Sequence, residues 1–256
     1  MTVRALWGPL ISVVTPNFNE KEYLPQFLDS IAGQIYRNVE LIVVDGGSTD
    51  GSLKLLHSFD GVPSRVIVDK TRNIGYIRNL GGHYARGTIQ FHTNSDTFLP
   101  PELLMRIMNL FAENPRLASV SGRTRPLKAS FMCSLAYHAF DLVRWAATYT
   151  LGKYRPGGSF FSIRTNVFKA IGGFPEVRIN EDGRLGEKLA GMPVKFDLGL
   201  WVGHHAKRFQ NLGSAKTLLY YSYIFGNYAP ALRRLLKTRE AQAAAVFTSK
   251  SNKGVV

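Results

Sequence analysis

Short apolar runs alternate with amphipathic stretches through the first half of the chain. The apolar runs are rich in β-branched residues and end in small polar residues, which predicts buried strands at residues 10–14, 39–44, 65–68 and 87–92. Between these runs, apolar residues recur at helical spacing. This pattern predicts a helix at residues 20–35, a second helix that follows the loop after the strand 39–44 and ends at Phe59, and a third helix at residues 79–85. Strands that alternate with helices are typical of an α/β fold with a doubly wound, mostly parallel sheet and helices on both faces.

The pattern is less regular in the second half of the chain. A further helix is expected to begin after Pro100-Pro101. Beyond it, the sequence predicts a strand at residues 118–122, an aromatic-rich helix at 131–151, a glycine turn with a strand at 157–163, and a helix at 180–190.

The character of the sequence changes again near residue 215. We therefore expect one domain over residues 1–212 and a C-terminal helical extension over residues 213–256 with a frayed tail. Within the extension, residues 217–237 place arginine and lysine beside tyrosine and phenylalanine, as in helices that lie at a membrane surface. A helix that packs on the core, or on a second subunit in a homodimer, explains the same pattern equally well.

The net charge of the chain indicates which classes of molecule it could bind. A formal net charge of +14 indicates polyanions such as nucleic acid, anionic lipid or phosphorylated substrates, or else a generally basic surface. No nucleic-acid-binding signature is present, so nucleic acid is disfavoured. No apolar run of about 18 residues occurs, and the single Cys133 excludes an internal disulfide. We expect a cytoplasmic protein that is peripheral on the inner face of the membrane.

Polar chemistry gathers where the predicted strands end. The segment Thr93-Asn94-Ser95-Asp96 follows the fourth strand, at the edge where open α/β sheets bind ligands. Asp96 offers hard oxygen ligands that suit Mg²⁺ or Mn²⁺ bridging to a diphosphate. Alone, an aspartate after a strand is more often a turn residue.

The order of the motifs resembles the inverting nucleotide-sugar glycosyltransferases of the GT-A fold, family 2. The resemblance covers roughly residues 10 to 210. It rests on the segments TPNFNE from Thr15, VVDGGSTDGS from Val43, NIGYIRNLG from Asn73, Asn94-Ser95-Asp96, GGS from Gly157 with GGFPE from Gly172, Asn180-Glu181-Asp182, and WVGHH from Trp201.

The resemblance implies a donor site at the first two loops. Thr15, Pro16 and Glu20 would line the base and ribose of the nucleotide. Asp45 would accept a hydrogen bond from a base N–H, with glycines permitting close approach. The chain departs from the family pattern at Gly46, which replaces the second aspartate of the pair.

The resemblance further implies a diphosphate and metal site. Arg78 would contact the diphosphate, because its planar fork matches phosphate oxygens. Asn94 and Ser95 would contact the donor, and Asn94 replaces the first aspartate of the family's D-x-D motif. Asp96 would bind the divalent cation, Mn²⁺ or Mg²⁺. One of the histidine pair His204 and His205 would be the second ligand, and the sequence leaves open which of the two faces the site.

The resemblance also implies which residues carry out the transfer reaction and line the acceptor site. Asp182 would be the general base that takes the acceptor proton, since inversion needs one such carboxylate. Gly158, Ser159 and Glu181 would form the wall of the sugar and acceptor site. Acidic residues also favour the first turn of any helix, so the order of the motifs is what favours catalysis here.

These implications lead to a hypothesis with two alternatives. The hypothesis is a metal-dependent inverting transferase that moves a hexose from a UDP or GDP sugar to a hydroxyl or phosphate acceptor, either lipid-linked or on a growing glycan. One alternative is a non-catalytic module that binds nucleotide or nucleic acid. The other is a degenerate transferase that serves as a partner subunit, which Gly46 and Asn94 motivate.

Overall fold

The computed structural model describes residues 8–71, 73–177 and 180–205. The predicted extension over residues 213–256, with its aromatic and basic segment 217–237, lies outside the described residues. Strands and helices follow in the order β1 Ile11–Asn17, α1 Leu24–Ala32, β2 Val39–Asp45, α2 Ser52–His57, β3 Ser64–Val68, α3 Ile74–Tyr84, β4 Ile89–His92, β5 Thr97–Phe98, α4 Leu103–Glu113, β6 Ser119–Leu127, α5 Phe131–Thr150, β7 Phe161–Arg164, α6 Thr165–Ala170, α7 Glu181–Lys188 and β8 Val194–His205.

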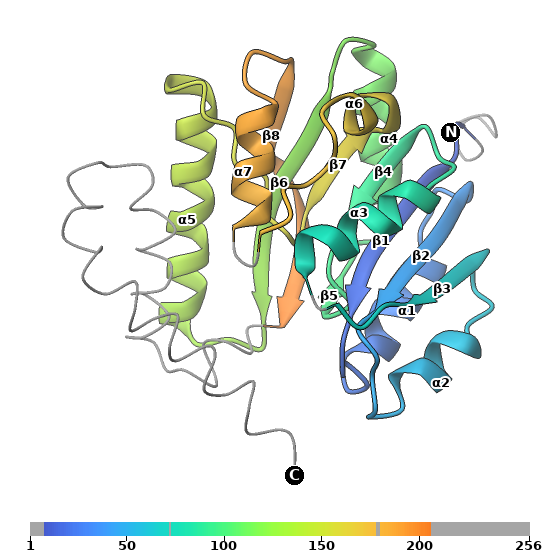
Figure 1. The fold of residues 1–256 in the computed structure, drawn as a ribbon. Helices are drawn as coiled ribbons and strands as arrows, with labels where there is room; N and C mark the ends of the chain where they lie inside the picture. Colours follow the sequence, from blue (N-terminus) through green and yellow to red (C-terminus); the bar gives the residue numbers. More distant parts are fainter. Residues whose placement is uncertain (1–7, 72, 178–179, 206–256) are drawn as a thin grey trace. The chain divides into compact units, whose positions relative to one another are not determined.

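One mixed sheet forms the centre of this part of the chain (Figure 1). Its strand order is β3-β2-β1-β4-β7-β6-β8-β5. The β1–β2, β1–β4, β2–β3 and β6–β8 pairs are parallel, whereas β7 runs antiparallel to both of its neighbours and β5 antiparallel to β8. The predicted doubly wound and mostly parallel sheet is therefore confirmed.

Alternate residues of the central strands face the two layers of helices. Val13 and Leu41 join a large core with residues of α1 and α4. Their neighbours Val14 and Ile42 face the opposite side, which α3 covers. A Cβ on Gly81 would collide with Val14, so glycine lets α3 lie close on the sheet. A separate aromatic and aliphatic core lies between β7, α6 and α7.

The structure corrects several predicted boundaries. Helix α3 begins at Ile74 rather than at residue 79, because the side chain of Asn73 caps it by accepting from the N–H of Tyr76. The strand predicted at residues 118–122 continues to Leu127 as β6. The short elements β5 and α6 have no counterpart in the predicted pattern. No described helix is long and apolar enough to span a membrane.

Candidate active site

A buried arginine joins four segments at the end of the sheet. Arg78 lies in α3 and is 2% exposed. Its Nη1 donates to the carbonyl of Thr93 at 3.2 Å, and its Nη2 donates to Asn94 Oδ1 at 2.7 Å and to the carbonyl of Gly158 at 2.9 Å. Its Nε lies 3.4 Å from Glu181 Oε1 as an ion pair. These contacts show that Arg78 holds the segments of the site together, and its contact with a diphosphate stays a prediction.

Asn94 has two partners that together use both ends of its amide. Its oxygen accepts from Arg78, and its Nδ2 donates to Ser159 Oγ at 3.1 Å. A carboxylate at this position could accept but could not donate. The hydroxyl of Thr93 reinforces the same junction by donating to the carbonyl of Ser159 at 2.9 Å. The departure from the D-x-D pattern therefore has a structural use in this chain.

The predicted base lies next to this junction. Asp182 is half-buried in the first turn of α7, and its Oδ2 accepts from the N–H of Gly158 at 2.7 Å. Asn180, just before the helix, has a φ of 63°, a left-handed conformation that is unusual for a residue other than glycine. Glu181 is 9% exposed and faces Arg78. The turn at residues 157–159 thus connects Arg78 to Asp182 through the two backbone groups of Gly158.

Asp96 and His204 come together at the edge of the sheet. Their Oδ2 and Nε2 atoms lie 3.6 Å apart, because β5 pairs with β8 directly after Asp96. The other ring nitrogen of His204, Nδ1, lies 3.1 Å from the hydroxyl oxygen of Tyr137 in α5. His205 points elsewhere: its Nε2 lies 2.8 Å from Gln26 Oε1. Of the two histidines, His204 is therefore the one beside Asp96.

This pair offers a divalent cation a limited set of ligands. Among the described residues, no group of three or more His, Cys, Asp and Glu side chains could hold a metal ion. One carboxylate and one imidazole nonetheless suit Mn²⁺ or Mg²⁺ when substrate phosphates and water supply the remaining ligands. The donor set thus fits a cation that arrives with a diphosphate.

Asp45 shapes the loop after β2. The residue is fully buried, and its Oδ1 accepts from the N–H groups of Gly47 and Ser48. Its Oδ2 accepts from Asn17 Nδ2 at 2.6 Å and from the hydroxyl of Ser48 at 2.7 Å. These four bonds hold the loop in shape, and the contact of Asp45 with a base N–H stays a prediction.

The first loop contributes backbone and one acidic side chain. Thr15 is fully buried, and Pro16 follows it within β1. The N–H of Glu20 donates to Ser52 Oγ at 3.0 Å, which ties this loop to the start of α2. Burial and the carboxylates of Glu22, Glu20 and Asp96 raise the pKa of Tyr23, so the charge of Glu20 and that of Asp96 act on the same phenol. Ser95 is 2% exposed, and its contact with the donor stays a prediction.

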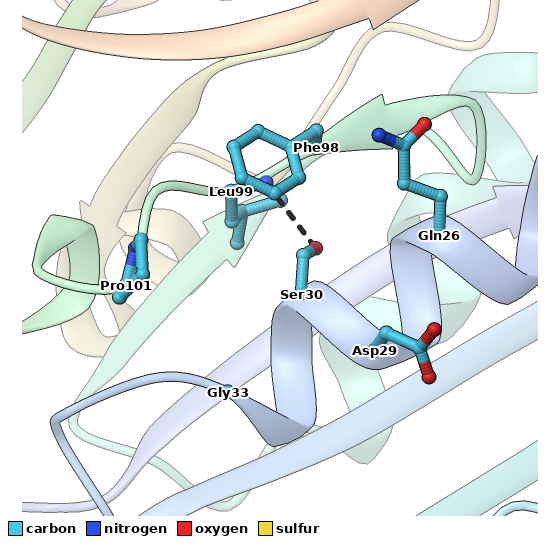
Figure 2. Close-up of a pocket in the computed structure, with 7 residues that line it drawn as sticks. All are labelled: Gln26, Asp29, Ser30, Gly33, Phe98, Leu99 and Pro101. Carbon is cyan, nitrogen blue, oxygen red and sulfur yellow. Dashed lines mark hydrogen bonds between the residues drawn. The ribbon is translucent and has the colours of Figure 1, made fainter.

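A cavity of about 330 Å³ lies between α1 and the segment that begins at Phe98 (Figure 2). It is bounded by α1 and by the segment after β5, where the N–H of Leu99 donates to Ser30 Oγ at 3.2 Å. None of the predicted site residues lines it. Its lining residues are Gln26, Asp29, Ser30, Gly33, Phe98, Leu99 and Pro101. The cavity is therefore separate from the hydrogen-bonded group around Arg78.

Two contributors were not predicted from the sequence. Thr93 begins the polar segment that ends at Asp96, and its position at the end of a predicted strand is the sequence feature that could have indicated a role in the site. Tyr137 lies in the middle of an aromatic-rich helix, 67 residues from His204, and no local pattern distinguishes it.

Comparisons with known proteins identify the family of this chain. A family model described as "Glycosyl transferase family 2" matches residues 12–171. The PGL/p-HBAD biosynthesis glycosyltransferase of Mycobacterium tuberculosis is 33% identical over 141 residues, which are 54% of this chain and 54% of that protein. The putative teichuronic acid biosynthesis glycosyltransferase TuaG of Bacillus subtilis is 27% identical over 119 residues, or 45% and 47% of the two chains. The match thus spans only about half of each of these relatives.

Solved structures show the same fold. The mannosyltransferase PcManGT from Pyrobaculum calidifontis, in complex with GDP-Man and Mn²⁺, has a TM-score of 0.67 and 20% identity, covering 98% of this chain and 78% of that one. TarS 1–349 of S. aureus, in complex with UDP-GlcNAc, has a TM-score of 0.62 and 21% identity, covering 77% and 58%. The expected GT-A fold is confirmed by these likenesses.

Proposed function

Because the chain belongs to glycosyltransferase family 2, we propose that it transfers a hexose, with inversion, from a nucleoside-diphosphate sugar to an acceptor hydroxyl or phosphate. The observation that supports this proposal best is the hydrogen-bonded group of Arg78, Asn94, Gly158 and Asp182 at the carboxyl ends of the strands. Open α/β sheets bind their ligands at that edge.

Asp182 is the proposed general base. Its carboxylate takes the proton of the acceptor hydroxyl while that oxygen forms a bond to the anomeric carbon of the sugar. The bond from that carbon to the diphosphate oxygen breaks, and the diphosphate leaves with the electron pair. The N–H of Gly158 donates to Oδ2 and the N–H of Gly183 donates to Oδ1, each at 2.7 Å, so both oxygens of the proposed base are held in place by backbone groups.

The departing diphosphate carries negative charge, which a positive group must neutralise. Asp96 and His204 would hold a divalent cation, which when bound neutralises the diphosphate. Mn²⁺ is named with GDP-Man in the PcManGT structure, which supports the choice of metal. The nucleotides named with the structural neighbours, GDP-Man and UDP-GlcNAc, support a GDP or UDP sugar as donor.

The acceptor is proposed to be lipid-linked, or a glycan built at a membrane. The net charge of +14 suits an anionic membrane surface and an acceptor that carries phosphate. The proposed place of action is the cytoplasmic face of that membrane, with the protein bound peripherally. The proposed homodimer through the C-terminal segment concerns residues outside the described part of the chain.

The proposal is tested with a panel of UDP and GDP sugars. Release of nucleotide should depend on Mn²⁺ or Mg²⁺, and NMR of the transfer product should show the inverted anomer. Asp182→Asn should lower transfer by about a hundredfold or more while donor binding persists, since an amide cannot take the proton.

Glu187→Gln is the matched control for that substitution. Glu187 lies on the same helix, its side chain is 62% exposed, and it pairs with Arg155 away from the Arg78 junction. Its turnover should be unchanged. Native turnover in Asp182→Asn would exclude Asp182 as the base. Nucleotide binding without transfer of any sugar would favour a non-catalytic module or a degenerate partner subunit.

A further inference from the structure

Helix α5 buries its charged side chains and exposes apolar ones, which is the reverse of an ordinary surface helix. The only acidic or basic residues in its sequence besides His138 are Asp141 and Arg144, and each is 3% exposed. The pair is joined by a contact of 3.1 Å between Arg144 Nη1 and Asp141 Oδ1. Asp141 Oδ2 also accepts from the N–H of Thr124 in β6. The charged face of the helix is therefore turned toward the sheet.

The outer face of α5 is mostly apolar, with His138 and Thr150 as its exposed polar residues. Most of the exposed large hydrophobic side chains of the described residues lie on it, and Leu135 and Leu142 are 51% and 55% exposed. They recur at helical spacing. The apolar residues of this face are Phe131, Met132, Leu135, Leu142, Val143, Trp145 and Tyr149, with Leu151 directly after the helix. At 20 residues the strip is about 30 Å long. An exposed apolar strip of this size, here interrupted by His138, is typical of a surface that binds another apolar partner.

The residues around the strip carry positive charge. Lys128 precedes the helix and Lys153 follows it, and both are exposed. No acidic residue lies on the outer face. If two copies paired through α5, lysines would meet lysines, because this face offers no carboxylate to receive them. Anionic headgroups complement both ends, and the acyl region accepts the apolar strip.

Trp145 and Tyr149 add a feature that suits lipid. Their ring centroids lie 5.7 Å apart on the exposed side of the helix. The indole of Trp145 favours the boundary between headgroups and acyl chains, since one end of it is apolar and the other polar. The hydroxyl of Tyr149 is bonded to the backbone of Phe196, so this residue adds only its ring to the surface. We propose that the outer face of α5 lies flat in an anionic membrane surface.

This docking would place the active site at the lipid. The inner face of the same helix holds Tyr137, whose hydroxyl contacts His204 beside Asp96. One helix therefore contacts the membrane on one side and the metal-binding pair on the other. The use of the surface rests on the proposed lipid-linked acceptor, whereas the docking itself does not depend on catalysis.

The test uses the full chain and vesicles of phosphatidylcholine with about 30% phosphatidylglycerol. The wild type should sediment with these vesicles, less so at high salt and not with phosphatidylcholine alone. Leu135→Gln/Leu142→Gln should weaken the partition at least about tenfold, because it removes two apolar side chains without changing the charge. Val68→Gln is the control: Val68 is 50% exposed on β3, at the other edge of the sheet, and its loss should leave binding unchanged.

A second measurement reports contact directly on the wild-type protein. Brominated lipids should quench tryptophan fluorescence, and Trp145→Phe should remove most of that quenching. The proposal is overturned if the wild type stays in the supernatant, if the double variant binds as the wild type does, or if the double variant converts a dimer to a monomer in the absence of lipid.

Donor hydrolysis without vesicles separates this proposal from the proposed function. The double variant should keep native hydrolysis, since no residue of the active site has changed. Asp182→Asn should keep native vesicle binding. If no nucleotide sugar is used while binding still depends on α5, the function is wrong and the docking surface stands.

Discussion

Two arginines are buried to nearly the same degree in different parts of the domain. Arg78 is 2% exposed and Arg144 is 3% exposed. Arg78 joins residues from α3, the end of β4, the turn at residues 157–159 and α7. Arg144 contacts Asp141 on its own helix, and its Nε donates to the carbonyl of Arg155 at 2.9 Å.

The difference lies in what the partners do. Arg78 contacts Asn94 and Glu181, which belong to the motifs that predict the active site. Arg144 instead fixes α5 against β6 and against the segment before the glycine turn. Burial of an arginine is costly in both places and does not by itself identify function. The identity of the partners, and the edge of the sheet where they meet, separates the two cases.

The largest effect is expected from Arg78→Met. The substitution leaves Glu181 buried without its cation and releases Asn94 and Gly158 from a shared donor. We expect transfer to fall by about a hundredfold or more and the free energy of unfolding by about 3–5 kcal/mol, measured by steady-state kinetics and urea unfolding. Arg78→Lys should recover part of the stability but little activity, because an ammonium group cannot reproduce the planar fork. Native activity in Arg78→Met would remove Arg78 from the site.

Arg144→Met should instead lower the stability of the protein without lowering its activity. Asp141 would remain buried without its partner, which should cost about 3–5 kcal/mol of unfolding free energy. The kcat/KM of the folded protein should stay close to native. The double variant Asp141→Leu/Arg144→Met should regain much of the loss, since no unpaired charge remains. A large loss of kcat/KM at full folding would show that the two arginines do not differ as proposed.

A smaller effect is expected from Tyr137→Phe. Without the hydroxyl, the ring of His204 loses the contact that orients it toward Asp96, so Mn²⁺ affinity should weaken by about 10- to 100-fold. Titration followed by electron paramagnetic resonance measures this directly. Tyr149→Phe, on the same helix but bonded to the carbonyl of Phe196, is the control and should bind Mn²⁺ as the wild type does. Equal affinities in all three proteins would exclude the positioning role.

The smallest effect concerns pH. Burial raises the pKa of Asp141 to about 6 from an ordinary value of 3.8, although Arg144 acts in the opposite direction. A carboxyl whose pKa is raised by folding favours the folded state most below its unfolded pKa, and this contribution is lost as pH rises through the folded value. The unfolding free energy of Asp141→Asn relative to wild type should therefore increase between about pH 4 and about pH 6. A change in the other direction would show that the ion pair outweighs burial.

The strands and the sheet could be predicted because their signal is local. β-branched runs that end in polar residues predict β1, β2 and β4 to within a few residues. The start of α3 was missed because glycines on both sides of Arg78 weaken the helical pattern, and the cap at Asn73 outweighs them.

The sequence selects several residues that the structure brings together, but it does not give their geometry, and their roles stay predictions. The motifs select Arg78, Asn94, Gly158, Ser159, Glu181 and Asp182, and the structure brings these six together. The directions of their side chains could not be predicted, because Arg78 contacts Gly158 and Glu181, which lie far from it in the sequence. The reversed polarity of α5 was equally hidden, since apolar residues occupy both faces and periodicity alone does not tell which face is covered.

The two-residue strand β5 has a consequence for the order of assembly. Asp96 meets His204 only because β5 pairs with β8, the last described strand, and the N–H of His205 donates to the carbonyl of Asp96. During synthesis on the ribosome, the loop after β4 must wait for more than a hundred further residues before this edge can close. A nascent chain that ends before β8 would therefore contain most of the central sheet and still lack the proposed metal-binding pair, so binding of a cation by this pair would have to follow the synthesis of β8.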